Sequence, residues 1–237
     1  MTFKYQYIAR YIANTPWAIL ESKMADMMDV FSFRSAGERF TAEEIKVRIG
    51  DGNPPANPSK NGAVAIIPLR GVIAHRMGTM DESSGGMSAE RFAAMVNQAA
   101  ADPQVGTILI DCDSPGGGCP GVMEAADAVF AARTAGKKVI AIANATMASA
   151  AYWITSQANE IVAIPSALDM GIGSIGVFAV HLDMTEQLAK DGVKVTIVRA
   201  GENKAEGNPF ETPSEEFFAT MKASAVAAKA IFVKQVA

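Results

Sequence analysis

From Ala63 onward the sequence alternates between short apolar runs and longer segments whose apolar residues have helical spacing. The apolar runs are about six residues long and the helical segments about twelve, a pattern typical of consecutive βαβ units. Because βαβ crossovers are right-handed and place helices over the strands, such units form a mostly parallel, buried sheet. The sequence therefore predicts an α/β fold of repeated βαβ units.

The expected elements follow one another along the whole of this region. The apolar runs predict strands over residues 63–69, 71–74, 107–112, 138–144, 160–165, 174–180 and 193–199. The helical spacing predicts helices over residues 88–102, 120–136, 149–158, 184–190 and 213–237, the first of them capped by Ser88. Two helices carry apolar faces that are expected to pack into the core: Val122, Ala125, Ala126, Val129 and Phe130 in one, and Phe217, Phe218, Met221, Ala225, Ala228, Phe232 and Val236 in the C-terminal one.

The chain divides near residues 50–62, where glycine, proline, asparagine and serine concentrate in GDGNPPANPSKNG. We therefore expect an N-terminal helical arm over residues 1–50, a linker over 51–62 and the main domain over 63–237. In the arm, Thr15-Pro16 is typical of an N-cap followed by proline at the first helical position. The apolar residues that follow share one helical face, which we expect to pack on the chain's own body or on a neighbouring subunit: Leu20, Met24, Met27, Met28 and Phe31.

Composition excludes several classes of protein. With 49% hydrophobic and 19% charged residues among 237, the chain has enough apolar side chain for a sizeable core and is not disordered as a whole. A net charge of −4 gives no basic footprint for nucleic acid. No apolar run approaches the length that crosses a bilayer, so we expect no membrane partner. Two cysteines cannot make a disulfide scaffold, and with two histidines they lack the spacing of a metal site.

The first candidate site is DSPGGG, which ends a predicted strand and precedes a helix. Its glycines, Gly116 and Gly117 among them, allow close approach of a ligand to backbone N–H groups. Such groups could cradle a phosphate or form an oxyanion hole, and a tight turn that needs glycine is the third interpretation. Neither GxGxxG nor GxxxxGK[ST] is present, which argues against a nucleotide site.

Three further segments contain residue types that carry chemistry. In MASAAYW, Ser149 stands among small residues at the start of a predicted helix. This position is suited to a nucleophile, and it is equally typical of a serine that caps the helix. GSIGV contains Ser174 at a turn into a predicted strand. RAGENK places Lys204 in a loop, where a lysine by itself is typical of a solvated surface charge.

DSPGGG, MASAAYW, GSIGV and RAGENK, in this order, resemble the signal peptide peptidase A family of serine proteases, in the ClpP/crotonase superfamily. The resemblance runs from about residue 63 to 232 and implies the ClpP/crotonase-like fold. It implies that Ser149 is the nucleophile, that Lys204 is the general base and that Ser174 helps hold the lysine. It also implies an oxyanion hole from Gly116, Gly117 and the N–H of Ala150. The resemblance implies a ring-like homo-oligomer, and it implies no metal and no cofactor.

Within that family the chain is most similar to the phage capsid (head) maturation proteases, because it shows no membrane anchor, one protease-sized domain and an N-terminal arm. The implied substrates are scaffold or capsid proteins, including a segment attached to the protease's own C-terminus, cut inside the prohead in the host cytoplasm. The chain ends within an apparent helix, as a shortened chain would. Where the family usually has two glycines after the nucleophile, this chain has Ala150 and Ala151, whose methyl groups narrow the approach to the serine.

A serine hydroxyl needs a nearby base to take its proton, and a lysine serves only when its amine is neutral. Burial disfavours the ammonium and lowers a lysine pKa. We therefore expect Lys204 to lie in a desolvated cleft beside Ser149.

Other interpretations stay open. His181 could replace Lys204 as the base, and the protein could be a host-type cytoplasmic peptidase that degrades signal peptides or proteins. It could also be a crotonase-type acyl-CoA enzyme, or a catalytically silent scaffold-binding protein. We expect Cys112 in the core, Cys119 near the cleft and His75 exposed.

Overall fold

The computed structural model describes the chain in eight segments, and the structural statements below concern these segments only. They are residues 11–13, 15–35, 38–41, 43–44, 57–77, 85–167, 171–201 and 203–237. Parts of the expected arm and linker, including residues 45–56, lie outside them.

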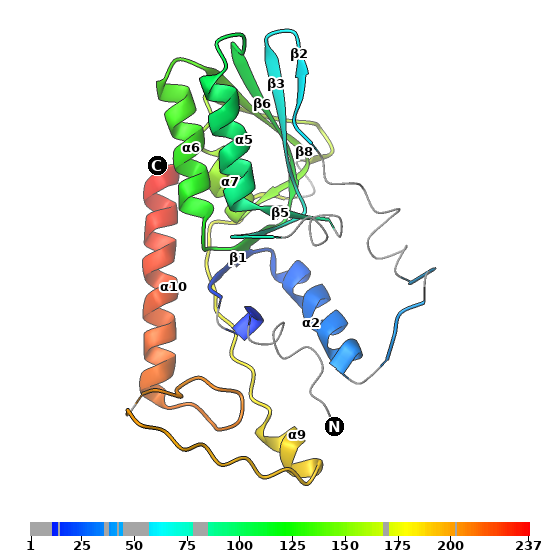
Figure 1. The fold of residues 1–237 in the computed structure, drawn as a ribbon, viewed down its shortest axis with the longest axis vertical. Coiled ribbons are helices and arrows are strands. Elements are labelled where there is room, and N and C mark those ends of the chain that lie inside the picture. The colour runs from blue at the N-terminus through cyan, green and yellow to red at the C-terminus, as the bar shows by residue number, and fades with distance from the viewer. Residues whose placement is uncertain are drawn as a thin grey trace.

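The body is built on a six-stranded sheet in the order β10-β8-β6-β3-β2, with β9 also paired to β8 (Figure 1). The bounds of the strands are β2 Ser59–Asn61, β3 Val64–Arg70, β6 Thr107–Ser114, β8 Lys138–Ala148, β9 Glu160–Ala163 and β10 Ile172–Gly173. β3, β6, β8, β9 and β10 pair in parallel, and only β2 is antiparallel. The predicted α/β class with a mostly parallel sheet is confirmed. Strand β2 is formed by residues from the end of the expected linker.

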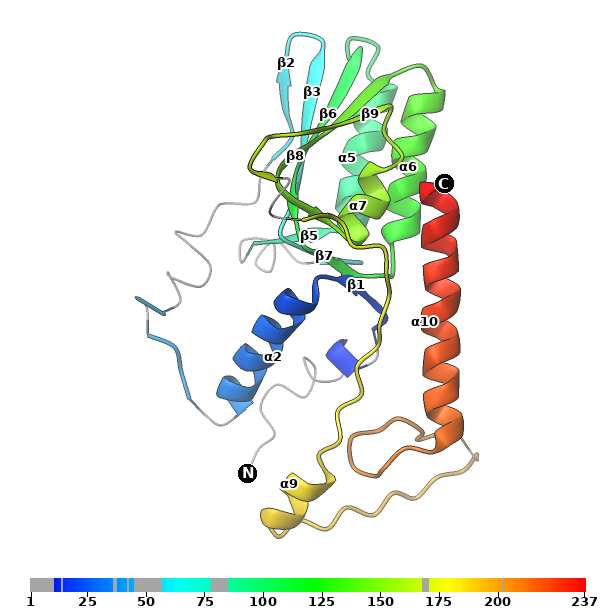
Figure 2. The ribbon, with the colours of Figure 1, turned by 180° about the vertical axis from the view of Figure 1, so that it is seen from behind.

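Helices α5 (Ala89–Ala101), α6 (Val122–Thr134) and α7 (Ala150–Thr155) lie together against one face of this sheet (Figures 1 and 2). Ser88 caps α5 as predicted, because its side chain accepts a hydrogen bond from the N–H of Arg91. The inward face expected for α6 is confirmed except at Phe130, which is 43% exposed. The guanidinium of Arg133 lies over its ring, 4.8 Å from the ring centre.

A second, four-stranded sheet crosses the lower edge of the body in the order β1-β7-β4-β5. Its strands are β1 Trp17–Ile19, β7 Gly116–Gly118, β4 Val72–Ala74 and β5 Gly86–Ser88. The N-terminal arm therefore joins the body through a strand. The helix expected from Pro16 was wrong at its start, because residues 17–19 pair with β7 and α2 begins only at Glu21 and ends at Ser35.

Residues 174–214, which we call the distal arm, run away from the body to the short helix α9 (Thr185–Lys190) and back (Figure 2). The strands expected over 174–180 and 193–199 are wrong. Apart from a bridge between Phe178 and Trp17, these residues have no described neighbour with which to form a ladder. Val198 is 94% exposed, so this β-prone sequence has little to pack against among the described residues.

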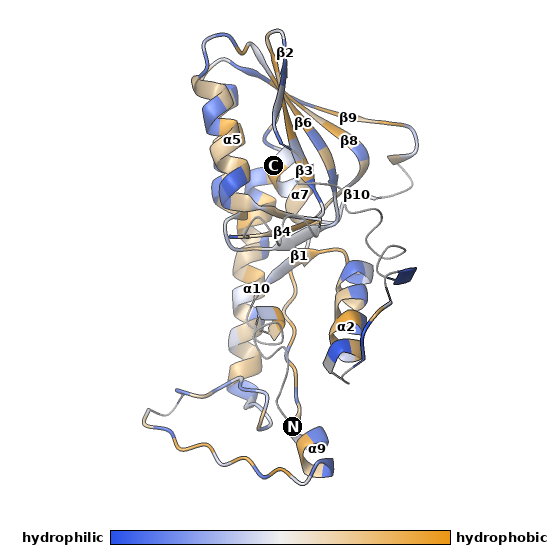
Figure 3. Ribbon diagram, turned by 45° about the vertical axis from the view of Figure 1, so that its right-hand side comes forward, coloured by the Kyte–Doolittle hydropathy of each residue, from blue (hydrophilic) through white to orange (hydrophobic). Residues whose placement is uncertain are grey.

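The C-terminal helix α10 (Glu215–Val236) begins at the distal arm and returns to the body. Only its last turns pack there: Phe232 stacks on Trp153 of α7 with ring centres 4.6 Å apart. Figure 3 shows apolar colouring along much of its length, and only Phe232 of the expected stripe is buried. None of the helices within the described segments is both long and apolar enough to span a membrane.

Candidate active site

Ser149 occupies the tight turn between β8 and α7, in an unusual backbone conformation. Its φ is 56° and its ψ is −118°, and Ser174 is the only other non-glycine residue with positive φ within the described segments. The turn is held by the Ser149 N–H, which donates to the Gly173 carbonyl at 2.6 Å, and by its own carbonyl, which accepts from the N–H of Trp153 at 2.9 Å. Positive φ in a serine costs free energy and persists only where the surroundings enforce it.

The Ser149 side chain does not serve as a helix cap. It makes no capping hydrogen bond to the first turn of α7, so the N-cap interpretation of this serine is wrong. The residue is 1% exposed and lies where strand ends and helix begins. A strand–turn–helix placement with a strained backbone is the geometry that projects the nucleophilic serine of α/β-hydrolases.

The glycine turn lies directly beside Ser149. A Cβ on Gly116 would be 3.0 Å from the carbonyl oxygen of Ala148 and 3.0 Å from the N atom of Ala150, the two residues that flank the serine. A Cβ on Gly117 would be 1.9 Å from the carbonyl oxygen of Ile73 in β4. Glycine is therefore required at both positions by close packing, and the structure brings Gly116, Gly117 and Ala150 together with Ser149.

Ser114 fixes the conformation of this turn, a role that the sequence interpretation missed. Its fully buried hydroxyl donates to the Gly71 carbonyl at 2.6 Å and accepts from the Gly116 N–H at 3.2 Å. The Gly116 N–H is thus already engaged. The first N–H groups of a helix have no partner inside it, which leaves the Ala150 N–H, at the start of α7, free of the helix ladder. The only sequence signal for Ser114 was its position within SPGG.

Ser174 lies near Ser149, whereas Lys204 does not. Ser174 follows Gly173, the residue whose carbonyl accepts the Ser149 N–H, and it is exposed. Lys204 is exposed in a turn of the distal arm, and Gly207 of the same turn packs against Phe217 near the N-terminal end of α10. Phe217, beside this turn, and Phe232, which touches α7, are separated by about 22 Å of helix. Within one chain the Lys204 amine therefore cannot reach Ser149 in this conformation.

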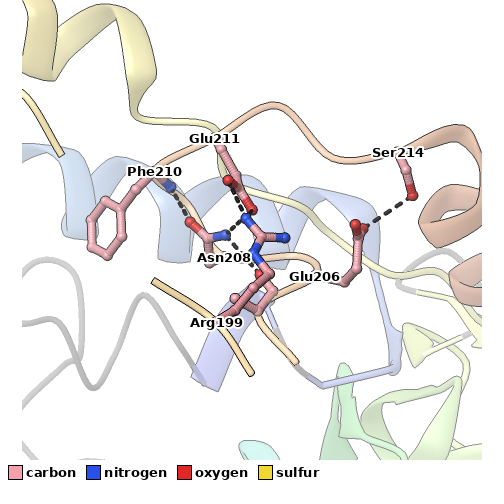
Figure 4. Close-up of polar contacts among 7 residues, drawn as sticks. Arg199, Glu206, Asn208, Phe210, Glu211 and Ser214 are labelled. Carbon is pink, nitrogen blue, oxygen red and sulfur yellow. Dashed lines mark hydrogen bonds and ion pairs between the residues drawn. The ribbon is translucent and has the colours of Figure 1, made fainter. Parts of the chain in front are cut away.

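The turn that carries Lys204 is cross-linked by polar contacts (Figure 4). Arg199 donates to both carboxylate oxygens of Glu211, one of them at 2.6 Å, and Asn208 donates to the same carboxylate at 2.9 Å. The hydroxyl of Ser214 donates to Glu206 at 3.1 Å. Lys204 is thus presented on an ordered loop at a distance from the body.

His181, the alternative base, also lies on the distal arm. Its ring is 5.8 Å from the ring centre of Phe217 and 5.9 Å from that of Phe218, at the start of α10. Its Nε2 atom is buried without a hydrogen-bond partner among the described residues. Like Lys204, it does not contact the Ser149 turn of its own chain.

The two cysteines and the other histidine take no part in this arrangement. Burial, with the nearby charges of Asp113 and Asp111, raises the pKa of the Cys112 thiol, which is in the core as expected. Burial raises the pKa of Cys119 to about 12, so this partly buried thiol is neutral near pH 7. His75 is exposed as expected. Among the described residues, no cluster of histidine, cysteine, aspartate or glutamate is suited to hold a metal ion.

Comparison with known proteins supports the resemblance noted in the sequence. Residues 131–237 match the model of peptidase family S49. The chain is 35% identical over 174 residues to the head-tail preconnector protein GP5 of Enterobacteria phage P21, covering 73% of this chain and 34% of that protein. It is 30% identical over 222 residues to the capsid assembly protease C of Escherichia phage lambda, covering 90% of this chain and 49% of that protein.

Similarity extends to a bacterial enzyme. Protease 4 of Salmonella typhi is 35% identical over 132 residues, which is 56% of this chain and 20% of that protein. The chain thus spans half or less of the length of these relatives. Among solved structures, an enoyl-CoA hydratase from Polaromonas sp. JS666 aligns over 73% of this chain and 77% of its own, at 14% identity and a TM-score of 0.36.

Proposed function

We propose that the protein is a serine endopeptidase in which Ser149 is the nucleophile and Lys204 the general base, and the match of residues 131–237 to the model of peptidase family S49 supports this proposal. The observation that carries the proposal is the geometry of the Ser149 turn. The serine has a φ of 56°, its side chain makes no capping hydrogen bond, and it lies beside two positions where close packing requires glycine. A structural turn would be served as well by glycine, without the cost of positive φ. A serine there is explained if its hydroxyl acts in a reaction.

The glycine turn supplies the second requirement of acyl transfer. A tetrahedral intermediate places negative charge on the former carbonyl oxygen, and preorganised N–H groups stabilise it. Gly117 follows Gly116, which packs against the N atom of Ala150, and the N–H groups of Gly117 and Ala150 are the donors that we assign to this task. Gly116, whose N–H is engaged by Ser114, shapes the turn and lets the substrate backbone approach.

Lys204 acts, in this proposal, on Ser149 of a second copy of the chain. The distal arm projects away from its own body and presents the lysine on an ordered loop. The arm and the first half of α10 carry exposed apolar side chains, Val193, Val195, Val198 and Phe218 among them. Such a surface is suited to association, and a closed homo-oligomer in which each arm reaches the next subunit would complete every site with the same contact. Ser174, next to Gly173, would then be placed to orient the incoming amine.

The reaction then follows from these positions. The neutral Lys204 amine takes the proton of the Ser149 hydroxyl as Oγ bonds to the substrate carbonyl carbon. The oxyanion forms at the Gly117 and Ala150 N–H groups. As the C–N bond breaks, the lysine ammonium returns its proton to the leaving amine, which yields an acyl-enzyme. Water, deprotonated by the same amine, attacks the ester and releases the carboxylic acid and Ser149.

The proposed substrates are the scaffold and capsid proteins of a phage prohead, including a segment that follows the protease in its own polypeptide. Support comes from the similarity to a lambda protein named for capsid assembly and to a phage P21 head-tail preconnector protein. The proposal places the enzyme inside the assembling prohead.

The test is incubation of the purified protein with candidate scaffold or capsid protein, followed by mass spectrometry of the products. Ser149→Ala should abolish cleavage and block labelling by a fluorophosphonate probe, because the attacking oxygen is gone. Ser166→Ala, a change at an exposed serine outside the site, is the matched control and should cleave as the wild type does. Undiminished cleavage by Ser149→Ala would refute the proposal, and turnover of an acyl-CoA without proteolysis would assign the fold to a different reaction.

A further inference from the structure

Strand β1 of the N-terminal arm lies as an extended peptide between two segments of the candidate active site. On one side it pairs antiparallel with the glycine strand β7, in the register Trp17↔Gly118, Ala18↔Gly117 and Ile19↔Gly116. On the other side the N–H of Trp17 donates to the Phe178 carbonyl at 2.8 Å, and its carbonyl accepts from the Phe178 N–H at 3.0 Å. Both edges of the arm strand are therefore hydrogen-bonded, one to the glycine strand beside Ser149 and the other to Phe178.

In this register the Ala18 carbonyl faces the N–H of Gly117, which we have proposed as an oxyanion donor. Hydrogen bonds join Cys119 N–H to the Pro16 carbonyl at 2.8 Å and Leu20 N–H to the Pro115 carbonyl at 2.9 Å. In an antiparallel ladder hydrogen-bonded pairs alternate with non-bonded ones, so the pair midway between these two, Ala18 and Gly117, is a bonded pair. The Ala18 carbonyl thus faces the Gly117 N–H, as the carbonyl of a bound substrate peptide would.

The arm strand packs on the same glycine as the turn that carries the nucleophile. A Cβ on Gly116 would be 2.2 Å from the Ala18 carbonyl oxygen and 3.0 Å from atoms of both residues that flank Ser149. Ala18 therefore packs on the same glycine as the serine turn does. With β1 paired to β7, this edge of the glycine strand is not open to a substrate peptide, and Ser149 is only 1% exposed.

An apolar anchor holds the arm strand in this position. The Trp17 side chain is fully buried and its indole N–H donates to the Ile12 carbonyl at 3.0 Å. Trp17 and Ile19 form a small cluster with Ile12 and Met24, against which Phe178 packs. The anchor belongs to this cluster, separate from the main core, so it can be weakened without emptying the core of the body.

We propose that β1 occupies the peptide-binding groove of the protease as a substrate-like strand of its own chain, and that cleavage requires its displacement. The proposal rests on the proposed role of Ser149. Pairing through main-chain groups accepts many sequences, so selectivity falls to the side chains that alternate along the strand. The fully buried Ala18 indicates that the groove takes an extended peptide with a small residue opposite Gly117.

The experiment locks the arm strand by a disulfide in the full-length chain. Pro16→Cys would face native Cys119 across a hydrogen-bonded pair, with Cα atoms about 5.5 Å apart, which is within the range that a disulfide spans. The readout is the rate at which a fluorophosphonate labels Ser149, measured oxidised and after reduction. We expect labelling to fall at least tenfold in the oxidised form and to recover on reduction. The wild type and the double variant Pro16→Cys/Cys119→Ser are the controls and should show no redox dependence.

A second variant acts in the opposite direction. Trp17→Ala weakens the anchor and should raise the labelling rate at least threefold, whereas Val96→Ala, a buried change in α5 far from the groove, should not. Equal labelling of the locked and reduced forms would overturn the occupied groove while leaving Ser149 as the nucleophile. Absence of Ser149 labelling in every form, Trp17→Ala included, would instead refute the proposed function.

Discussion

Strain at Ser149 can be measured by comparing two inactive variants, Ser149→Ala and Ser149→Gly. Both lack the hydroxyl, so neither should cleave, but they differ in whether a Cβ must be held at φ 56°. Relief of that crowding is worth about 1–2 kcal/mol per residue. Glycine has greater conformational freedom in the unfolded chain, which offsets about 0.5–1 kcal/mol of this stabilisation. The glycine variant should therefore be the more stable by about 0.5–1 kcal/mol.

The assay is urea unfolding of the two variants, supported by thermal melts. For a chain of this size the difference corresponds to a melting temperature higher by about 1–4 °C for Ser149→Gly. Ala151→Gly, within the buried helix α7, is the control and should lose about 0.5–1 kcal/mol because glycine brings no relief at helical φ. A glycine variant at residue 149 that is less stable than the alanine variant would refute the strained-turn reasoning.

Two further predictions concern the groups around the turn. Gly117→Ala should lower the free energy of unfolding by about 1–3 kcal/mol through overpacking, since the new Cβ would lie 1.9 Å from the Ile73 carbonyl oxygen. The control Gly106→Ala has open space around it and should change stability little, and urea titration of both variants measures the difference. Because burial raises the pKa of Cys119 to about 12, folded protein keeps this thiol protonated at pH 9 while unfolded protein does not. Stability should therefore decline as pH rises above the ordinary thiol pKa. Cys119→Ser should make this decline shallower and leave the part that the buried Cys112 contributes, and a wild-type pH profile identical to that of Cys119→Ser would contradict the prediction.

The sequence was sufficient to predict features whose cause is local. Strands β3, β6, β8 and β9 and the capped helix α5 were expected close to where they lie, since apolar periodicity and caps act over a few residues. Ser149 and the glycine turn lie together as expected, because they follow the carboxyl ends of β8 and β6, which are neighbours in one parallel sheet.

Features that depend on a partner elsewhere were missed. Residues 193–199 have the composition of a strand, yet a strand needs a neighbour, and the distal arm leaves the sheet. Residues 17–19 follow a proline that is typical of a helix start, but their backbone groups are bonded to β7 and Phe178. Lys204 was expected beside Ser149, and only the folded chain shows that α10, whose length was predicted, packs on the body by its last turns and so keeps the Lys204 turn away from it.

The central claim is that the nucleophile and the base meet across two copies of the chain. Its most direct test mixes Ser149→Ala with Lys204→Ala, each inactive alone, by co-refolding in equal amounts and assaying cleavage. If Lys204 serves the neighbouring Ser149, random assembly restores about a quarter of the sites, because each needs one intact serine and one intact lysine from different chains. Activity that stays at the level of the separate variants, in particles shown to contain both chains, would contradict the account.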